Sequence, residues 1–259
     1  MVYDYQKLLE EFKNIANKLW IKGVNNYTNS VGLTLENLLG KKSDSMYFPD
    51  YRGIEIKCTQ RFSHYPINLF SLTFDGPMLY QMNIILQKYG KTDYVYNDKK
   101  ILISTLSCKE KILVNNKFYF KLNISKEEEK IYLEIYDQQN NLLEKEAYIN
   151  FKTIKSRLEL KLSVLALIWA SKRNFEDELY FRYYKIVIYK LRTFEKFIEL
   201  LERDIIQADI VCRVSRSGEE EGRQRNRNLV FRIKKEKIEE LFEVIETYDN
   251  DSCSRFQIL

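Results

Sequence analysis

Apolar and polar positions repeat with two different periods along this 259-residue chain. Apolar residues recur every three or four positions over residues 4–22 and 194–203, which predicts two amphipathic helices. Other stretches alternate with a period of two and predict strands. The strands are expected at residues 50–58, 67–74, 101–106, 117–122, 131–136, 147–151, 205–214 and 229–233. This mixture predicts an α/β fold in which helices flank a mixed central sheet.

Four stretches complete the prediction. Residues 152–170 have a strong helical pattern that becomes apolar all round after Lys161, which predicts one central, buried helix. Residues 78–89 are also expected to be helical, and residues 236–247 to form a final amphipathic helix. The stretch 180–188 fits either a strand or a helix.

The stretch from Asp50 to Lys57 predicts a strand, a turn at Gly53 and a second strand. Because side chains alternate along a strand, Glu55 and Lys57 project together, away from the face that carries Ile54, Ile56 and Cys58. Asp50 can reach the same place from the other side of the turn. Two carboxylates and one ammonium at a sheet edge would supply oxygen ligands for Mg²⁺ and a cation beside an attacking water. These groups suit metal-assisted phosphodiester hydrolysis.

A short helix before this stretch carries a further candidate. Thr34 can cap a helix that ends at Gly40, and Glu36 lies in its first turn. A carboxylate at a helix start is common and interacts favourably with the helix dipole. Its position immediately before the Asp50 strand lets Glu36 face the same metal ion.

Composition excludes several other classes of chemistry. Lys and Arg number 42 against 37 Asp and Glu, and the net charge of +5 permits a polyanionic partner without requiring one. The 4 Cys have no metal-binding spacing, which predicts free thiols in a reducing compartment. The single His, without a GxSxG motif, disfavours a Ser/His/Asp triad, and phosphate-binding glycine loops are missing. Neither a signal peptide nor a stretch of membrane-spanning length is found, so we expect a cytoplasmic protein.

Basic residues at two places are candidates for DNA binding. Arg61 and His64 lie in an aromatic loop directly after the catalytic stretch, although a lone His is more often an ordinary loop residue. A second set lies in the predicted hairpin near the C-terminus, where the planar guanidinium group matches both phosphate and the guanine edge. This set comprises Arg213, Arg216, Arg223, Arg225, Arg227 and Arg232. The acidic run 219–221 would repel phosphate, so an exposed hairpin tip of mixed charge explains this segment equally well.

An Asp-x4-Glu-x-Lys spacing arises often by chance in a chain that is 31% charged, but the surrounding residues are more specific. The ordered set of residues 32–40 (GLTLENLLG), 49–50 (PD), 53–59 (GIEIKCT) and 67–70 (INLF) resembles the PD-(D/E)XK nucleases of the MutH and MvaI/BcnI group, the second more closely. Residues 194–233 resemble the last third of that group.

The resemblance implies a Mg²⁺-dependent type II restriction endonuclease that cuts double-stranded DNA at a short sequence. It implies a restriction-endonuclease-like fold over residues 1–259, with two lobes that form a DNA cleft, a catalytic region at 30–75 and a DNA-contacting hairpin at 205–235. Asp50 and Glu55 are implied as metal ligands, Lys57 as the residue that orients or activates water, and Glu36 as an auxiliary carboxylate. A monomer and a companion DNA methyltransferase in the same restriction-modification system are also implied.

The chain departs from the family pattern at one place, and two alternative functions remain open. The resemblance leads us to expect a histidine-bearing loop before the last Phe-Arg-Ile strand, but residues 222–228 offer only arginines and other residues without an imidazole. Base recognition is therefore expected to differ. A MutH-like enzyme that nicks hemimethylated DNA is an alternative, and a DNA-binding protein with a relic nuclease core is another. The intact set of Asp50, Glu55 and Lys57 argues against the relic.

Overall fold

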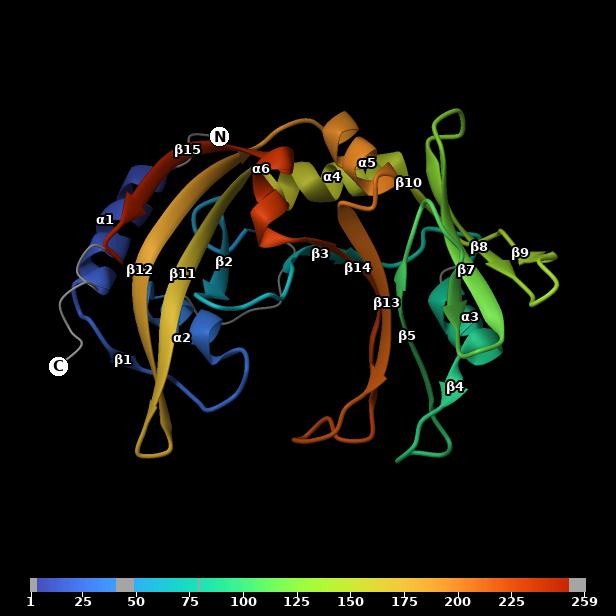
Figure 1. Cartoon of the computed structure of the whole chain (residues 1–259), viewed down its shortest axis with the longest axis horizontal. Helices are drawn as coiled ribbons and strands as arrows, with labels where there is room; N and C mark the ends of the chain where they lie inside the picture. Colours follow the sequence, from blue (N-terminus) through green and yellow to red (C-terminus); the bar gives the residue numbers. More distant parts are fainter. Residues whose placement is uncertain (1–3, 41–48, 79, 252–259) are drawn as a thin grey trace. The chain divides into compact units, whose positions relative to one another are not determined.

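The computed structural model describes residues 4–40, 49–78 and 80–251, apart from the side chains of Asn226 and Arg227. The chain divides into two compact units. Unit 1 comprises Met1–Ile67, Glu159–Arg192 and Ile238–Leu259, and unit 2 comprises Asn68–Leu158 and Thr193–Lys237. Each unit is therefore assembled from segments that are far apart in the sequence (Figure 1).

Unit 1 is built on a mixed sheet, as the sequence predicted. The strand order is β1 (Ile21–Lys22), β12 (Glu178–Leu191), β11 (Val164–Phe175), β2 (Glu55–Gln60), and β15 (Phe242–Asp249) also pairs with β12. The β2 strand runs parallel to β11, whereas the other pairs are antiparallel. This places β2 beside the buried centre of the sheet.

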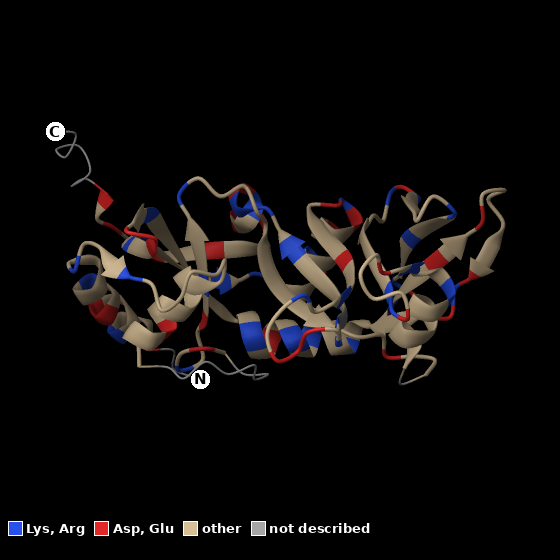
Figure 2. Cartoon of the chain, turned by 90° about the horizontal axis from the view of Figure 1, so that it is seen from below, with Lys and Arg blue, Asp and Glu red and all other residues tan. Residues whose placement is uncertain are grey.

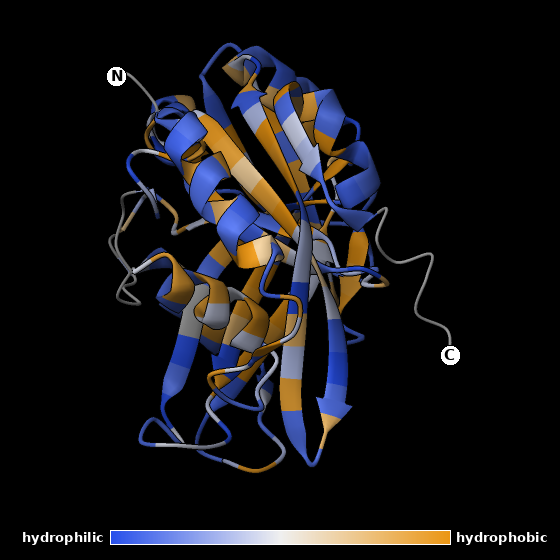
Figure 3. Ribbon diagram, turned by 90° about the vertical axis from the view of Figure 1, so that its left-hand side faces the viewer, coloured by the Kyte–Doolittle hydropathy of each residue, from blue (hydrophilic) through white to orange (hydrophobic). Residues whose placement is uncertain are grey.

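Two helices of unit 1 cover one face of this sheet. Helix α1 (Tyr5–Ala16) buries Leu8 and Phe12, and α2 (Ser30–Leu38) buries Leu35, in one cluster with Ile54 and Ile56 of the Asp50–Lys57 stretch. The outward face of α1 is hydrophilic, as expected of an amphipathic surface helix (Figure 3). The apolar side of residues 54–58 is thus fixed in the core, and Glu55 and Lys57 point to the other side.

Unit 2 contains two further sheets among its described residues. One has the order β3 (Ile67–Leu72), β14 (Gln224–Ile233), β13 (Ile206–Val214), β5 (Lys100–Leu106), β4 (Lys91–Thr92). The other has the order β10 (Tyr148–Asn150), β8 (Lys130–Tyr136), β7 (Phe118–Ser125), β6 (Ile112–Val114), with β9 (Leu142–Glu144) on β8. Helices α3 (Gln81–Tyr89) and α5 (Phe194–Glu202) belong to this unit, and the rings of Phe70, Phe197 and Phe231 meet at 5.0–5.7 Å in its core.

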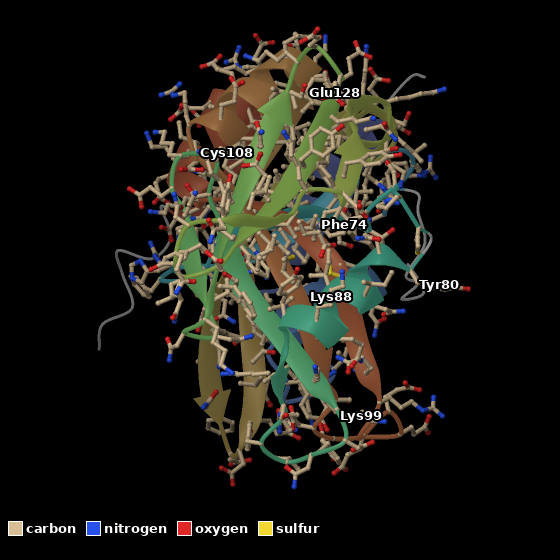
Figure 4. All side chains as sticks on the ribbon, turned by 90° about the vertical axis from the view of Figure 1, so that its right-hand side faces the viewer. Phe74, Tyr80, Lys88, Lys99, Cys108 and Glu128 are labelled. Atoms are coloured by element: carbon tan, nitrogen blue, oxygen red, sulfur yellow. The ribbon has the colours of Figure 1, made fainter. Side chains whose placement is uncertain are left out.

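Most predicted elements are confirmed, among them the helix at 78–89, the strands of the C-terminal hairpin and the β7–β8 hairpin with Glu128 at its tip (Figure 4). The ambiguous stretch 180–188 is part of β12. The predicted helix over 152–170 is wrong in its second half, because α4 (Phe151–Leu162) ends before β11 begins. Residues 165–168 are 0% exposed. A strand that is covered on both faces has the same unbroken apolar sequence as a buried helix, and periodicity cannot separate them.

The last predicted helix is also wrong. A 3₁₀ turn η1 (Lys235–Lys237) and the short helix α6 (Ile238–Leu241) lead into β15, which pairs with residues 185–191 of β12. Pairing with a distant strand overrides the local helical pattern here. Two helix boundaries differ as well: α1 ends at Ala16, and α2 begins at Ser30, so Thr34 lies inside the helix, where its hydroxyl accepts a hydrogen bond from the Val24 N–H.

Among the described residues no helix is long and apolar enough to cross a membrane.

Candidate active site

The Asp50–Lys57 stretch folds as a tight hairpin. Tyr51 and Ile54 exchange backbone hydrogen bonds of 2.9 and 2.7 Å, and the two residues between them have positive φ, 46° at Arg52 and 87° at Gly53. Positive φ at both central positions is typical of a two-residue type I′ turn. The next pair along the hairpin is Asp50 and Glu55, whose side chains therefore project to the same face. Four residues separate Asp50 from Glu55: the two turn residues, Arg52 and Gly53, and the Tyr51–Ile54 pair that flanks them.

Glu55 is the buried centre of the site. Its side chain is 1% exposed, and its Oε1 lies 2.5 Å from Lys57 Nζ and 3.3 Å from Lys161 Nζ. Neither carboxylate oxygen accepts a hydrogen bond of good geometry from any residue that the structure describes. Burial raises the pKa of Glu55, and the charge of Asp50 adds to this, whereas Lys57 and Lys161 oppose it.

The Asp50 carboxylate is fixed beside Glu55. Its Oδ2 accepts a hydrogen bond of 3.0 Å from the backbone N–H of Ile56. The two carboxylates offer oxygen ligands for a divalent cation, and the ammonium groups of Lys57 and Lys161 also face the buried Glu55. No group of three or more Asp, Glu, His and Cys forms a metal cluster within the described ranges. Mg²⁺ typically takes only one or two carboxylates and keeps several waters, so Asp50 and Glu55 fit it.

Glu36 lies on α2, which packs against β2. Burial raises the pKa of the Cys58 thiol, and the charges of Glu36 and Asp50 raise it further. This places Glu36 near Cys58, on the strand that carries Glu55 and Lys57. Its role as an auxiliary carboxylate stays a prediction. Cys58, Cys108 and Cys212 are free thiols, as predicted, and Cys253 lies outside the described residues.

Lys161 is a residue of the site that sequence reasoning missed. It lies in the last turn of α4, and the chain then enters β11, where Leu165 pairs with Glu55. A single helix over 152–170 would have left Lys161 in mid-helix with no relation to the Asp50–Lys57 stretch. Only the break at Ser163 and the parallel pairing of β11 with β2 bring it to Glu55, and no sequence motif marks that contact.

Arg61 and His64 line a pocket of about 1310 Å³ in unit 1. Residues 58–60 of β2 also line it, together with residues 171–174 of β11 and the loop 26–28. Three aromatic side chains on its wall are mostly exposed: Tyr27 at 74%, Phe62 at 83% and Tyr65 at 84%. The guanidinium group of Arg61 pairs with Asp251 and lies 5.1 Å from the ring centre of Tyr184.

The C-terminal arginines lie on or between β13 and β14. Arg213 and Arg225 are exposed and face one another across the hairpin. Arg223 is exposed and pairs with Glu220 at 2.6 Å. Arg232 Nη1 lies 2.8 Å from Oδ2 of Asp209, which is 7% exposed. The Arg227 side chain lies outside the described residues. Acidic and basic residues are interspersed over the chain (Figure 2), so individual contacts matter more here than a uniform field.

Arg216 joins two loops of unit 2. Its guanidinium group makes hydrogen bonds of 2.8 and 2.5 Å to the two oxygens of Asp93, which is 0% exposed. It also lies 4.5 Å from the ring centre of Tyr94. The hydrogen bond to Arg216 holds the pKa of Asp93 well below its usual range, and backbone N–H groups of residues 95 and 96 lower it further. The charge of Arg216 is thus largely compensated by Asp93.

The chain is similar to known restriction endonucleases. The model of the MvaI/BcnI restriction endonuclease family matches residues 9–242. A solved complex of restriction endonuclease MvaI with its cognate DNA substrate is 27% identical, with a TM-score of 0.87 over 94% of this chain and 98% of that chain. A structure of MvaI in the absence of DNA is also 27% identical, with a TM-score of 0.59 over 96% of this chain and 99% of that one. A search of curated proteins finds no match.

Proposed function

Since the chain belongs to the MvaI/BcnI restriction endonuclease family and is a type II site-specific deoxyribonuclease, we propose that it hydrolyses phosphodiester bonds in both strands of double-stranded DNA with Mg²⁺ held by Asp50 and Glu55. The observation that carries this proposal is the pairing of two carboxylates on one hairpin: Asp50 is held by the Ile56 N–H, and the buried Glu55 lies beside it with Lys57 Nζ at 2.5 Å. Two neighbouring carboxylates repel one another, and a divalent cation bound by both would remove that repulsion.

Each residue of the hairpin has a separate task in the proposed mechanism. The backbone N–H of Ile56 holds the Asp50 carboxylate in place, and the Tyr51–Ile54 turn sets its separation from Glu55. Lys57, at 26% exposure, is accessible to a phosphate and can orient the attacking water and stabilise the negative charge that develops on the phosphate. When bound, Mg²⁺ would supply Lewis-acid stabilisation of that charge and lower the pKa of a bound water. Glu36 is proposed as an auxiliary carboxylate.

Two surfaces are proposed to contact DNA. In unit 1 the pocket beside β2 offers Arg61, His64 and exposed aromatic rings, a combination that suits the sugar–phosphate backbone and the faces of bases. In unit 2 the hairpin of β13 and β14 offers a set of guanidinium groups that suit phosphates and guanine edges. This set comprises Arg213, Arg216, Arg223, Arg225, Arg227 and Arg232.

Among these arginines, Arg232 is the best suited to recognising bases, together with its partner Asp209. Asp209 Oδ1 and Arg232 Nε are buried and have no hydrogen-bond partner among the described residues. An acceptor and a donor fixed side by side match the amino and carbonyl groups of base edges. The phosphate backbone would be contacted by the more exposed arginines.

The proposed role as a restriction endonuclease implies a biological setting. A site-specific nuclease would also cut the DNA of its own cell, so we propose that a companion DNA methyltransferase protects those sites. We further propose that the enzyme acts as a monomer in the cytoplasm, as the family resemblance implies. Light scattering of the protein with and without a DNA duplex would detect a dimer and refute the monomer.

Digestion of a plasmid of known sequence with Mg²⁺, followed by sequencing of the ends, tests the activity and reveals the target together. We expect linear products with one recurring end sequence. Asp50→Ala and Lys57→Ala are expected to abolish cleavage while DNA binding persists in a gel shift, and full activity of either variant would refute the assignment. A product that is only nicked would favour the MutH-like alternative, and binding without cleavage by the unmodified protein would favour a relic core.

A further inference from the structure

A single oxygen of Glu55 has two ammonium groups beside it. Lys57 Nζ lies 2.5 Å and Lys161 Nζ 3.3 Å from Glu55 Oε1. Lys57 is two residues away on the same strand, whereas Lys161 comes from a helix more than 100 residues later in the chain. The side chains are 1% exposed at Glu55 and 19% exposed at Lys161, so water screens this pair only partly.

The backbone holds Lys161 at this position. Leu158 and Leu162 are 0% exposed and anchor the last turn of α4 in the core. The Ser163 hydroxyl donates a hydrogen bond to the Glu159 carbonyl at the end of the helix. Leu165 then pairs with Glu55 in the parallel β2–β11 ladder. The contact is therefore a consequence of the fold and not of a chance side-chain conformation.

The charges in this cluster balance. Asp50 and Glu55 carry two negative charges, and Lys57 and Lys161 carry two positive charges. A divalent cation bound to Glu55 would add two positive charges at the oxygen that Lys161 already approaches. Ammonium and divalent cation repel one another strongly at such separations when water is largely excluded.

We propose that Lys161 is a positioning residue of the active site that serves as the counter-ion of Glu55 until a divalent cation displaces it. The inference rests on the proposed function, in which Asp50 and Glu55 hold that cation. In the cation-free protein Lys161 holds the buried carboxylate in place through the 3.3 Å contact with Oε1. Its flexible four-carbon stem and partial exposure let the ammonium group move to water when the cation arrives.

Cation binding by full-length variants tests the proposal. Lys161→Met keeps the stem and removes the charge, and Lys161→Arg keeps the charge. Lys152→Met is the matched control, because Lys152 is an exposed residue of the same helix. Affinity for Ca²⁺ and Mg²⁺ is measured by calorimetry without DNA, and the melting temperature is measured by circular dichroism in EDTA and in excess Ca²⁺.

We expect Lys161→Met to bind the cation about tenfold more tightly than the unmodified protein, because it lacks the competing charge. In EDTA its melting temperature should be lower, and Ca²⁺ should raise it by more than in the unmodified protein. Lys161→Arg and Lys152→Met should both keep the original affinity.

The failure of this inference differs from that of the proposed function. If the unmodified protein binds the cation and cleaves DNA but Lys161→Met binds no more tightly, only the counter-ion role is overturned. Equal tightening in Lys152→Met or Lys161→Arg also overturns it, because the effect would then reflect total charge or side-chain shape. If the unmodified protein neither binds a divalent cation nor cleaves DNA, the proposed function fails and this inference fails with it.

Discussion

The turn between the two proposed metal ligands can be perturbed with a single methyl group, in Gly53→Ala. Gly53 has a φ of 87°, in the left-handed region that disfavours a Cβ atom. That strain costs roughly 1–2 kcal/mol. Alanine also restricts the unfolded chain, which returns about 0.4–1 kcal/mol. We therefore expect a net loss of about 1 kcal/mol in the free energy of unfolding, or about 2–4 °C in melting temperature for a chain of this length.

The effect on cleavage should be far larger than the effect on stability. Relief of the strain requires rotation of the Arg52–Gly53 peptide, which disturbs the 2.9 and 2.7 Å hydrogen bonds of the Tyr51–Ile54 pair. Asp50 is the next residue, so its carboxylate shifts relative to Glu55. A displacement of about 1 Å in an active site typically costs about 100-fold in rate. We expect a loss of that order in the single-turnover rate of plasmid cleavage.

Gly40→Ala is the matched control. Gly40 has a φ of 69°, and a Cβ atom there would meet no heavy atom of the described residues within 4 Å, so the backbone strain is similar but no pair of proposed ligands flanks it. The melting temperature should fall by a similar amount in both variants, and Gly40→Ala should cleave plasmid DNA at close to the rate of the unmodified protein. Cleavage by Gly53→Ala within threefold of the unmodified protein, at an equal loss of stability, would refute the role of the hairpin in setting the Asp50–Glu55 separation.

Three further predictions concern charged groups. Glu55→Gln should abolish cleavage yet raise the melting temperature of the cation-free protein near neutral pH. Burial raises the pKa of Glu55, so ionisation of this carboxylate costs stability as the pH rises from the unfolded-state pKa through the folded-state pKa. A lower melting temperature of Glu55→Gln would contradict this. Asp93→Asn and Arg216→Gln should each lower the melting temperature by an amount that the double variant does not double, because both remove one pair. The folded-state pKa of Asp93 is lowered, so its contribution is fully present above the unfolded-state pKa. The contribution declines as the pH falls below about 4 and is lost only as the pH passes through the lowered folded-state pKa, so a difference that does not shrink at all between pH 5 and pH 2 would count against the pair. Arg232→Gln should weaken DNA binding by about 1–3 kcal/mol and allow cleavage at altered sites. Arg223→Gln should mainly reduce the salt dependence of DNA binding. Identical cleavage sites in Arg232→Gln and the unmodified protein would argue against base recognition by Arg232.

The sequence alone determined the Asp50–Lys57 hairpin. Alternation over residues 54–58 separates Ile54 and Ile56 from Glu55 and Lys57, and a glycine between Asp50 and Glu55 allows the tight turn that brings the carboxylates together. These relations extend over only the nine residues 50–58, and local backbone geometry settles them. The elements of the β13–β14 hairpin were predicted for the same reason.

The tertiary structure decided which distant groups meet that hairpin. Lys161 reaches Glu55 only because α4 stops at Leu162 and β11 pairs in parallel with β2, and β15 is a strand only because it pairs with β12. The pairing of Arg216 with the buried Asp93 joins residues 123 positions apart, and no local pattern predicted it, whereas DNA binding by Arg216 stays a prediction. Local sequence patterns show how apolar a segment is. Long-range pairing decides which elements cover that segment and which charged side chains lie side by side, and the information that sets this pairing is spread over the whole chain.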